Sequence, residues 1–513
     1  MSQIRPIPRD GNPFPGHGVW VDTHGTRHYD NIPATLLDSL QRWADRTPDA
    51  EALVELGGER LTYRQVRDRA ARVAGGLRER GVGSGDRVAV RYPTGVDWVL
   101  AFWGTLMAGG IPVAVNIRSA QPELELVLSD SGASVDLAPG TPLPDGEPYQ
   151  APPATADAIA GLFYTSGTTG RPKGVPTTHE AFLTNCENMI RSLGISADAG
   201  TALRTLISVP LFHVTGCNSQ LLTALYVGGA AVIMPALDPA ALAASLADHR
   251  ISFVVTVPAV YALLLRRGLL AGADVSSVRW VGYGGAPIAS ALVSQIKAAF
   301  PGAKVINGFG MTETASLMTV LPDGEAVDHA DSVGYCVPSV ELAVDPIGDD
   351  GAGELLARGA NVTKGYWHWD DATAAALVDG WLRTGDIVRV DEAGRVHIVD
   401  RAKDIIIRGG ENISSVEVED ALAGAPGVAE AAVIAVPDEV MGEKVGAVVV
   451  GAVVAGGREL DVDAVIAHVS ALIADFKVPQ YLTVWDGPLP RNPGGKILKE
   501  HLRQQVEWGE PLR

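Results

Sequence analysis

A chain of 513 residues is too long for one ordinary hydrophobic core, so two or more domains are expected. Hydrophobic residues make up 47% of the sequence and charged residues 20%, a composition that excludes a disordered chain. The formal net charge of -19 argues against nucleic acid and anionic membrane surfaces as partners. A protein of this charge has to bind any phosphate compound with local donors and individual lysines.

The first third of the chain alternates between helices and strands. The segment Met1–Asp30 is polar and lacks an apolar stretch, so no ordinary signal peptide is expected. The expected elements are a helix with Leu36, Leu37, Leu40 and Trp43 on one face, strands at Ala52–Glu55 and Arg60–Tyr63, a long helix with Val66, Val73 and Leu77 inward, a strand at Val88–Val90, a helix at Val96–Met107 and a strand at Ile111–Val115. This order predicts mostly parallel sheets covered by helices, with ligands at the carboxyl ends of the strands.

The proline-rich stretch 138–157 predicts an irregular surface connection. After it, the apolar run Ile159–Tyr164 predicts a buried strand that ends in a loop of hydroxyl side chains, glycines and a lysine. The loop residues are Thr165, Ser166, Gly167, Thr168, Thr169, Gly170 and Lys173. Glycines let the backbone approach an anion, hydroxyls and amides donate hydrogen bonds, and lysine supplies a point charge, so this grouping predicts a phosphate-binding loop.

This loop differs from the Walker A loop, in which a helix begins at once behind Gly-Lys-Ser/Thr. Pro172 and Pro176 prevent a regular helix before Thr177, whose spacing to Glu180 predicts a capping box. A glycine- and threonine-rich surface turn is the alternative interpretation. It would explain the glycines but not the grouping of hydroxyls with a lysine.

The run from Tyr164 to Val175 resembles the phosphate loop of the adenylate-forming superfamily, which includes acyl-CoA synthetases, firefly luciferase and nonribosomal peptide adenylation domains. Further matches follow in the family's order as far as Lys496. The resemblance implies an α/β fold with a large N-terminal adenylation domain, residues 1–402, of helix-covered and mostly parallel sheets. It also implies a small, mobile α+β C-terminal domain, residues 403–513, that carries a catalytic lysine and coenzyme A contacts.

The stretch Ser208–Asn218 ends an apolar strand and opens a helical segment, so His213 is expected at a strand-to-helix junction. In acyl-CoA synthetases the residue at this place borders the acyl pocket and the α-phosphate, and the resemblance makes His213 a catalytic candidate. Amino-acid-activating relatives carry an aspartate there, which this chain lacks. The expected acyl-pocket residues are His213, Val214, Gly216, Val257 and Tyr261, and a hydrogen-bonded core histidine remains the alternative. The apolar window Leu221–Leu237, broken by glycine and proline, predicts a helix end and a core strand rather than a membrane span.

Two further strands run into turns that resemble the family's adenine pocket. The expected ATP contacts are Gly284, Gly285, Ala286, Asn307, Gly308, Phe309, Gly310, Met311 and Thr312. By resemblance Phe309 stacks on the base, Asn307 meets its edge and Thr312 reaches a phosphate. Glu313 is the expected magnesium ligand and a catalytic residue, because a hard cation shared with phosphate oxygens needs a carboxylate. An exposed helix cap is the alternative for Glu313.

Asp386, placed after a predicted tight turn, matches the family's ribose-binding carboxylate. Charged residues then separate two runs of β-branched residues, which is unusual for buried strands, although a surface hairpin is also possible. The resemblance implies that Arg401 contacts ribose or phosphate and that Lys403 is the hinge. It also implies that Arg408, Gly409, Gly410 and Lys477 form the coenzyme A side.

The last 110 or so residues have the size of a small domain. Expected elements are a helix at Val416–Leu422, strands at Ala431–Val436 and Val445–Val450, and a helix at Val462–Ile473. Lys496 follows a loop of prolines and glycines, and a lysine in such a place is usually only solvated. Only the resemblance makes it catalytic. Met441 stands where the family often has an aromatic residue that stacks on the adenine of coenzyme A.

These features predict an acid–CoA ligase that uses ATP, magnesium and coenzyme A and forms an acyl adenylate from a small-molecule carboxylic acid. The alternatives are an acyl-AMP ligase that loads a carrier protein or activates an unusual acid, and a non-catalytic nucleotide-binding relative. The three cysteines, Cys186, Cys217 and Cys336, are far apart and predict neither disulfides nor a zinc site. A cytoplasmic protein without an integral membrane segment is expected.

Overall fold

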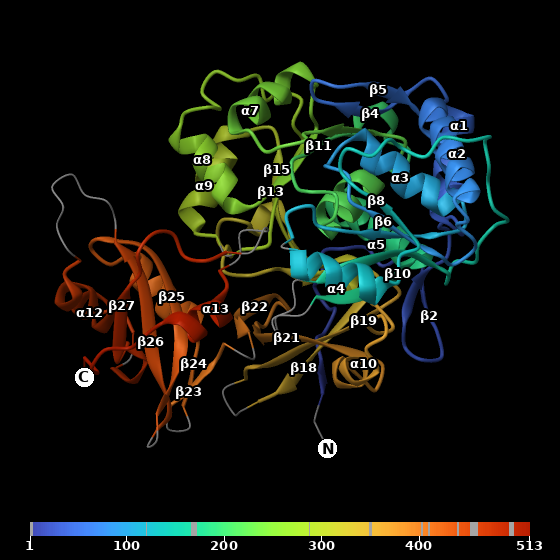
Figure 1. Cartoon of the computed structure of the whole chain (residues 1–513). Coiled ribbons are helices and arrows are strands. Elements are labelled where there is room, and N and C mark those ends of the chain that lie inside the picture. Colours follow the sequence, from blue (N-terminus) through green and yellow to red (C-terminus); the bar gives the residue numbers. More distant parts are fainter. Residues whose placement is uncertain are drawn as a thin grey trace.

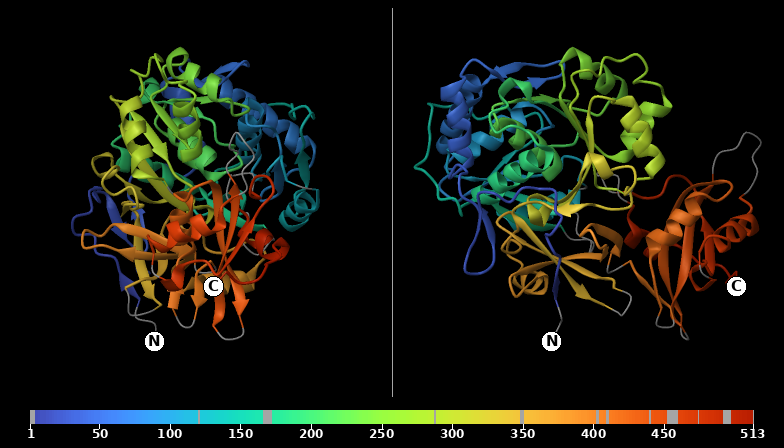
Figure 2. Two further views of the ribbon diagram at one scale, coloured as in Figure 1. Left: turned by 90° about the vertical axis from the view of Figure 1, so that its left-hand side faces the viewer. Right: turned by 180° about the vertical axis from the view of Figure 1, so that it is seen from behind.

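The computed structural model of the chain describes residues 4–119, 121–165, 172–286, 288–347, 351–401, 404–408, 411–438, 441–451, 460–473, 475–491 and 497–512. Within these ranges, three large sheets and their helices form one body, and the residues from 404 onward form a smaller group beside it (Figure 1). The view from behind shows the same arrangement (Figure 2, right). The structure confirms the predicted α/β fold with a large N-terminal and a smaller C-terminal part.

The largest sheet has the strand order β17-β16-β15-β14-β13-β11-β12-β4-β5. Its strands are β4 (Glu51–Glu55), β5 (Arg60–Thr62), β11 (Arg204–Ile207), β12 (Ala230–Ile233), β13 (Phe253–Thr256), β14 (Trp280–Tyr283), β15 (Lys304–Met311), β16 (Ser316–Leu321) and β17 (Tyr335–Cys336). The strands from β15 to β4 are parallel neighbours, and β16, β17 and β5 join antiparallel at the two sides. The carboxyl ends of six neighbouring strands therefore lie along one edge.

Helices cover both faces of this sheet, as alternating side chains in its central strands require. One face packs against α7 (Pro239–Asp248), α8 (Pro258–Arg266) and α9 (Ser290–Ala299). The other packs against α1 (Leu36–Arg46), α5 (His179–Leu193) and α6 (Thr223–Tyr226). Val254 and Val281 belong to the first buried cluster, while Phe253 belongs to the second. The buried sheet therefore fixes the positions of the residues that directly follow its strands.

A second sheet has the order β10-β9-β7-β6-β8. Its elements and the helices around it are β6 (Arg87–Val90), β7 (Ile111–Ala114), β8 (Val135–Leu137), β9 (Ile159–Thr165), β10 (Lys173–Thr178), α2 (Tyr63–Glu79), α3 (Val96–Met107) and α4 (Gln121–Ser131). All its pairs are parallel except β9 with β10. The helices and strands predicted for the first third of the chain are confirmed to within one or two residues, and residues 138–157 form neither helix nor strand.

A third sheet is antiparallel, which the expectation of mostly parallel sheets did not include. Its strands are β1 (Arg5–Pro6), β18 (Val340–Pro346), β19 (Gly353–Gly359), β20 (Leu377–Val378), β21 (Trp381–Val390) and β22 (Val396–Arg401). Residues 391–395 join β21 directly to β22, and so short a turn can connect only antiparallel strands. A separate hairpin is formed by β2 (Val19–Val21) and β3 (Arg27–Tyr29).

The C-terminal group has its own sheet and its own buried cluster. Its elements are β23 (Ile406–Arg408), β24 (Glu411–Ile413), β25 (Val428–Asp438), β26 (Gly442–Gly451), β27 (Tyr481–Val484), α11 (Ser415–Ala423), α12 (Val462–Ser470) and α13 (Lys499–Gln505). The predicted elements are present, but α12 ends at Ser470 rather than Ile473, because residues 471–473 form a turn on Val469. Short helical segments elsewhere are η1 (Gly200–Ala202), η3 (Thr312–Thr314), η4 (Asp323–Glu325), η5 (Asp475–Lys477), α10 (Asp370–Ala376) and the π-helical η2 (Thr215–Leu222).

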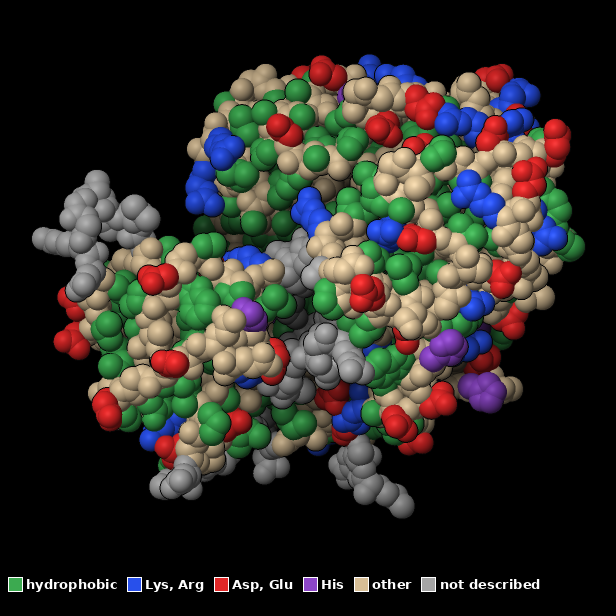
Figure 3. Space-filling view, in the orientation of Figure 1, with side chains coloured by type: hydrophobic (Ala, Val, Ile, Leu, Met, Phe, Trp, Pro, Cys, Tyr) green, Lys and Arg blue, Asp and Glu red, His purple; other side chains and the backbone are tan. Residues whose placement is uncertain are grey.

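Acidic and basic side chains are interspersed on the face shown in Figure 3, and neither sign forms a continuous patch there. This face therefore offers a phosphate ligand no continuous positive patch. In the described parts of the chain, no helix has both the length and the apolar character needed to cross a membrane.

Candidate active site

The ends of the predicted phosphate loop are fixed by a hairpin. Thr165, the last residue of β9, is the direct cross-strand partner of Lys173, the first residue of β10. The connecting residues Ser166, Gly167, Thr168, Thr169 and Gly170 lie outside the described residues. The capping box predicted from Thr177 to Glu180 does not form, because residues 173–178 are a strand at the sheet edge, where Pro176 needs no hydrogen-bond partner for its nitrogen. The cap of α5 is Thr178, whose hydroxyl accepts from the Ala181 N–H at 3.1 Å.

The two segments predicted to hold adenine lie side by side. β14 and β15 are parallel neighbours, with Tyr283 opposite Asn307, so Gly284, Gly285 and Ala286 leave the sheet next to Gly308. A Cβ on Gly284 would stand 2.3 Å from the Gly308 carbonyl oxygen, so the two backbones approach too closely for any other residue. The Asn307 amide donates to the Ser332 carbonyl at 3.3 Å. Phe309, Met311 and Thr312 are half-buried, and Gly310 is exposed.

Glu313 is buried, with 6% of its surface exposed, on the single turn η3 that follows β15. Its carboxylate oxygen Oε1 accepts from the Tyr366 hydroxyl at 2.8 Å, and its carbonyl accepts from the Thr363 N–H at 2.7 Å. The η3 turn is capped by Met311 and Thr314, so the alternative of an exposed Glu313 cap is wrong. Burial and the adjacent Glu313 carboxylate raise the pKa of Tyr366, which keeps the phenol a hydrogen-bond donor.

His213 lies between β11 and η2, as predicted, and its Nε2 atom is buried without a hydrogen-bond partner in the part of the chain that the structure describes. Burial lowers the pKa of His213 to about 4, so the ring is neutral at neutral pH. The hydrogen-bonded core histidine considered as an alternative is therefore not observed at Nε2. A Cβ on Gly216 would meet the Pro210 carbonyl oxygen at 2.5 Å, which fixes glycine in the first turn of η2.

The remaining acyl-pocket candidates differ in burial. Val214 and Val257 are half-buried, and Val257 directly follows β13. Tyr261 on α8 is fully buried, and its hydroxyl donates to the Gly282 carbonyl at 2.9 Å. This contact joins α8 to β14. His213, Val257 and Gly284 thus follow the carboxyl ends of β11, β13 and β14, which are neighbours in the sheet.

The predicted ribose carboxylate, Asp386, is 2% exposed and lies inside β21 rather than after a tight turn. Residues 384–386 oppose the single residue Leu355 of β19, so the strand bulges there, and Gly385 has a φ of +72°. Asp386 is the cross-strand partner of Arg401, whose backbone alone is described. The two residues assigned to ribose are therefore neighbours across the β21–β22 hairpin.

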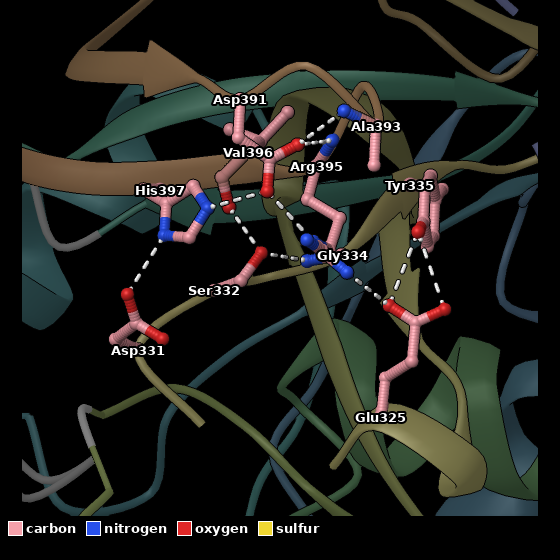
Figure 4. A network of polar contacts seen from close by, with 10 residues as sticks. All are labelled: Glu325, Asp331, Ser332, Gly334, Tyr335, Asp391, Ala393, Arg395, Val396 and His397. Atoms are coloured by element: carbon pink, nitrogen blue, oxygen red, sulfur yellow. Dashed lines mark hydrogen bonds and ion pairs between the residues drawn. The ribbon is translucent and has the colours of Figure 1, made fainter. Parts of the chain in front are cut away.

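A polar network joins residues 325–335, which follow the adenine segment and β16 in the chain, to this hairpin (Figure 4). Arg395 pairs with Glu325 at 2.9 Å and with Asp391 at 2.7 Å, and His397 contacts Asp331 at 2.9 Å. Ser332, whose carbonyl accepts from Asn307, donates its hydroxyl to the Val396 carbonyl at 2.8 Å. Burial alone would raise the pKa of Asp391, but hydrogen bonds from Arg395 and His397 hold it at about 2. The network couples the two sides of the predicted nucleotide site.

Among the C-terminal candidates, Arg408 donates to the Phe476 carbonyl at 3.0 Å, and Lys477 binds both carboxylate oxygens of Glu417, at 2.6 and 2.7 Å. Both cations therefore contact residues of the C-terminal group. Lys403, Gly409, Gly410 and Lys496 lie outside the described residues, and their predicted roles stay predictions.

The sequence did not reveal several residues that contact the turn carrying Glu313. Asn185 and Asn218 come from two helical segments, Asn361 and Tyr366 come from the segment that follows β19, and each contacts residues 313–317. Their one sequence signal is an asparagine or tyrosine inside or beside an otherwise apolar stretch, which does not identify a partner more than forty residues away.

Comparison with known families covers most of the chain. The family model described as "AMP-binding enzyme" matches residues 40–145 and 136–367. The model described as "AMP-binding enzyme C-terminal domain" matches residues 417–496.

Three characterised relatives align over nearly their whole length. Feruloyl-CoA synthase of Amycolatopsis sp is 38% identical over 90% of this chain and 97% of its own. The long-chain-fatty-acid–CoA ligase FadD13 of Mycobacterium tuberculosis is 34% identical over 92% and 98%. The fatty acid–[acyl-carrier-protein] ligase ScoC of Streptomyces coeruleorubidus is 33% identical over 93% and 98%.

Among solved structures, o-succinylbenzoate coenzyme A synthetase (MenE) from Bacillus subtilis, in complex with ATP and a magnesium ion, is similar with a TM-score of 0.81. The two chains are 28% identical, and the match covers 92% of this chain and 100% of the other.

Proposed function

Because the chain belongs to the family of AMP-binding enzymes and is an ATP-dependent acid–CoA ligase, we propose that the edge formed by β11, β13, β14 and β15 holds the acid and ATP. The observation that carries this assignment is that His213, Val257 and Gly284 follow the carboxyl ends of three neighbouring parallel strands. Ligands of open α/β sheets bind at this edge.

The chemistry explains which groups the site needs. A carboxylate resists attack by a thiol because it is anionic and would have to expel oxide. When its oxygen attacks the α-phosphorus of ATP, the bond to the β-phosphate breaks and pyrophosphate leaves. The thiol of coenzyme A then attacks the acyl carbonyl and AMP leaves. Negative charge accumulates on the phosphate oxygens in the first step, so preorganised donors and cations there lower the barrier.

We assign the phosphates to Thr165, Lys173 and the loop residues 166–170. The ends of this loop are fixed opposite each other in the β9–β10 hairpin, which supports the assignment. The adenine would lie between residues 284–286 and Phe309, and Asp386 with Arg401 would hold the ribose. The contacts of Ser332 support this grouping, because its carbonyl accepts from Asn307 on the adenine side and its hydroxyl donates to the Val396 carbonyl in β22.

Glu313 is the residue that we propose for magnesium. In the described residues no three His, Cys, Asp or Glu side chains gather as a metal cage. A single buried carboxylate fits magnesium, which is usually held by one or two carboxylates together with substrate phosphates. Bound there, the ion would neutralise phosphate charge. Tyr366 and the η3 turn hold the Glu313 carboxylate in place.

We propose a domain boundary between residues 402 and 403, since β22 pairs within the antiparallel sheet and β23 within the C-terminal sheet. Lys403 would be the hinge. Lys496 would reach the adenylate site for the first step, and Arg408, Gly409, Gly410 and Lys477 would face coenzyme A in the second. The Lys477–Glu417 ion pair would then have to open or share its charge.

For the acid, we propose an apolar or aryl carboxylic acid bound near His213, Val214 and Val257. Among the described residues assigned to this pocket none is a carboxylate, so a free ammonium group would be buried there unpaired, at a cost of several kcal/mol. The relatives that activate ferulate-type and long-chain fatty acids support this class. ATP–pyrophosphate exchange with a panel of acids tests it. Exchange should occur with aromatic or fatty acids, whereas exchange with a free α-amino acid alone would contradict the proposal.

A carrier-protein thiol is a second candidate acceptor. Similarity to ScoC favours it, as does Met441 in a place where an aromatic residue is common in the family. The test is to supply the preferred acid and ATP with either free coenzyme A or a phosphopantetheinylated carrier protein. We expect faster AMP release with coenzyme A. Acyl transfer to the carrier alone would reassign the acceptor without affecting the adenylation step.

A further inference from the structure

The segment Thr363–Trp367 lies between two parts of the proposed site and is bound to both by its backbone. The Thr363 N–H donates to the Glu313 carbonyl at 2.7 Å, and the Trp367 N–H donates to the Gly174 carbonyl at 2.8 Å. Gly174 directly follows Lys173 in β10. The segment therefore fixes the turn that carries Glu313 relative to the strand that carries Lys173.

The side chain of Tyr366, in the middle of this segment, contacts the same two residues. Its hydroxyl donates to Glu313 Oε1 at 2.8 Å, and Lys173 Nζ lies 4.8 Å from the centre of its ring. A lysine over a phenol ring at this distance is held by a cation–π interaction. One side chain thus joins the carboxylate and the ammonium group that we assign to magnesium and phosphate.

Tyr366 itself is held rigidly. Gly365 has a φ of +148°, and a Cβ there would meet Thr373 Cγ2 at 2.6 Å, so this turn requires glycine. The Thr373 hydroxyl accepts from the Tyr366 N–H at 2.9 Å and donates to the Trp369 carbonyl at 2.8 Å. These contacts fix the direction in which the ring leaves the backbone.

The backbone around Glu313 is also held, although it is strained. Ala315 and Ser316 have φ angles of +52° and +121°, which side-chain-bearing residues rarely adopt. Buried asparagines stabilise the turn, since Asn218 donates to the Ala315 carbonyl at 2.8 Å and Asn361 to the Thr314 carbonyl at 2.8 Å. With the backbone fixed, the freedom that remains is the rotation of the Glu313 side chain. The Tyr366 hydroxyl restricts that rotation.

We propose that Tyr366 is a positioning residue for adenylation: its hydroxyl orients the Glu313 carboxylate for magnesium, and its ring holds the Lys173 ammonium group beside it. The inference rests on the proposed magnesium role of Glu313. A carboxylate has about four lone-pair sites, so accepting one hydrogen bond at Oε1 leaves capacity for a metal ion.

Binding of an uncleavable ATP analogue, with a methylene group between the α- and β-phosphorus atoms, tests this without turnover. Its dissociation constant is measured by calorimetry with saturating magnesium and with EDTA. The magnesium gain is the dissociation constant in EDTA divided by the dissociation constant in magnesium. Tyr366→Phe removes the hydroxyl and keeps the ring, so the gain should fall about tenfold, as for a lost hydrogen bond to a charged acceptor. Affinity in EDTA should stay at the parent level.

Tyr366→Leu removes the ring as well. Lys173 then loses its cation–π contact, so affinity in EDTA should also fall, by about threefold. The matched control is Tyr226→Phe, because the Tyr226 hydroxyl donates to Glu187 Oε1 at 2.6 Å in a buried pair between α6 and α5. Both Tyr→Phe variants should lower the unfolding temperature, but Tyr226→Phe should leave the magnesium gain unchanged.

Glu313→Gln separates failure of the inference from failure of the proposed site. It should abolish the magnesium gain, and adding Tyr366→Phe to it should change nothing further. If Glu313→Gln abolishes the gain while Tyr366→Phe matches the parent, Tyr366 has only a structural role and the inference is wrong. If Glu313→Gln retains the gain, the magnesium role of Glu313 is wrong and the inference fails with it.

Discussion

Burial of two histidines makes the stability of the protein depend on pH. Burial lowers the pKa of His213 to about 4 and that of His179, whose Nδ1 accepts from the Leu36 N–H, also to about 4. The pKa of a histidine in the unfolded chain is about 6.5. Between about pH 4 and 6.5 the unfolded state therefore binds more protons, and the free energy of unfolding should decrease as the pH falls through this window.

Replacing His213 by Gln should remove one of these protons. Between about pH 4 and 6.5, the unfolding free energy of the His213→Gln variant should change less steeply with pH than that of the parent. The difference in slope should be up to about 1.4 kcal/mol per pH unit. Urea unfolding at several pH values measures the slope. His17→Gln, at an exposed histidine, should keep the parent slope. An equal slope in His213→Gln and parent would show that His213 is not held neutral by burial.

At the residue scale, residues in short sequence motifs could be predicted from the sequence, whereas contacts between residues far apart in the chain could not. The motif residues are local in sequence, so Gly284, Asn307 and Asp386 could be named and are found at strand ends or in one hairpin. Tyr366 could not be named, because its partner Glu313 is 53 residues away and the phenol carries no signal of that contact. The same holds for Asn218, which contacts Ala315 across 97 residues.

At the element scale, the close approach of β14 and β15 is the feature that most constrains the adenine side. Gly284→Ala would drive a Cβ into the Gly308 carbonyl and separate the strand ends. We expect at least about tenfold weaker ATP binding, since displaced contacts cost more than 1.4 kcal/mol in a close-packed interior. Equilibrium binding of ATP checks this.

Gly302→Ala is the control, because a Cβ at that turn meets nothing within 4 Å. It should bind ATP like the parent. Equal affinities for all three proteins would show that the ends of β14 and β15 do not hold the base.

The strengths and failures of element prediction have physical causes. Helix α3 was predicted at its exact bounds, since an apolar run between glycines and polar residues marks both ends. β10 was missed because Pro176, within it, and Pro172, just before it, are unusual in a strand and are tolerated here at the edge of the sheet. The antiparallel sheet was missed because apolar runs such as Val340–Pro346 indicate strands but not which neighbours they pair with.

At the scale of the whole molecule, buried polar contacts hold the C-terminal group in the observed arrangement. Asp400, at the end of β22, accepts from the Ser415 N–H at 2.5 Å and from its hydroxyl at 2.7 Å, at the start of α11. Lys499 on α13 donates to the same hydroxyl at 2.6 Å and pairs with Glu419 at 2.8 Å. The contact of Asp400 with Ser415 crosses the proposed hinge, so a change of arrangement for the second half-reaction has to break or rebuild it.

The central claim is that one adenylate site serves two half-reactions in two arrangements of the C-terminal domain. The direct measurement is rapid-quench, single-turnover kinetics of each half-reaction, acyl-AMP formation and transfer of supplied acyl-AMP to coenzyme A. The parent, Lys496→Ala, Gly410→Leu and a control at the exposed Lys304, Lys304→Ala, are compared. Lys496→Ala should lose adenylation by about a hundredfold or more and keep transfer, since one preorganised cation is removed from one transition state. Gly410→Leu should do the reverse, and Lys304→Ala should match the parent. Equal loss of both half-reactions in Lys496→Ala, or loss of neither, would contradict the account.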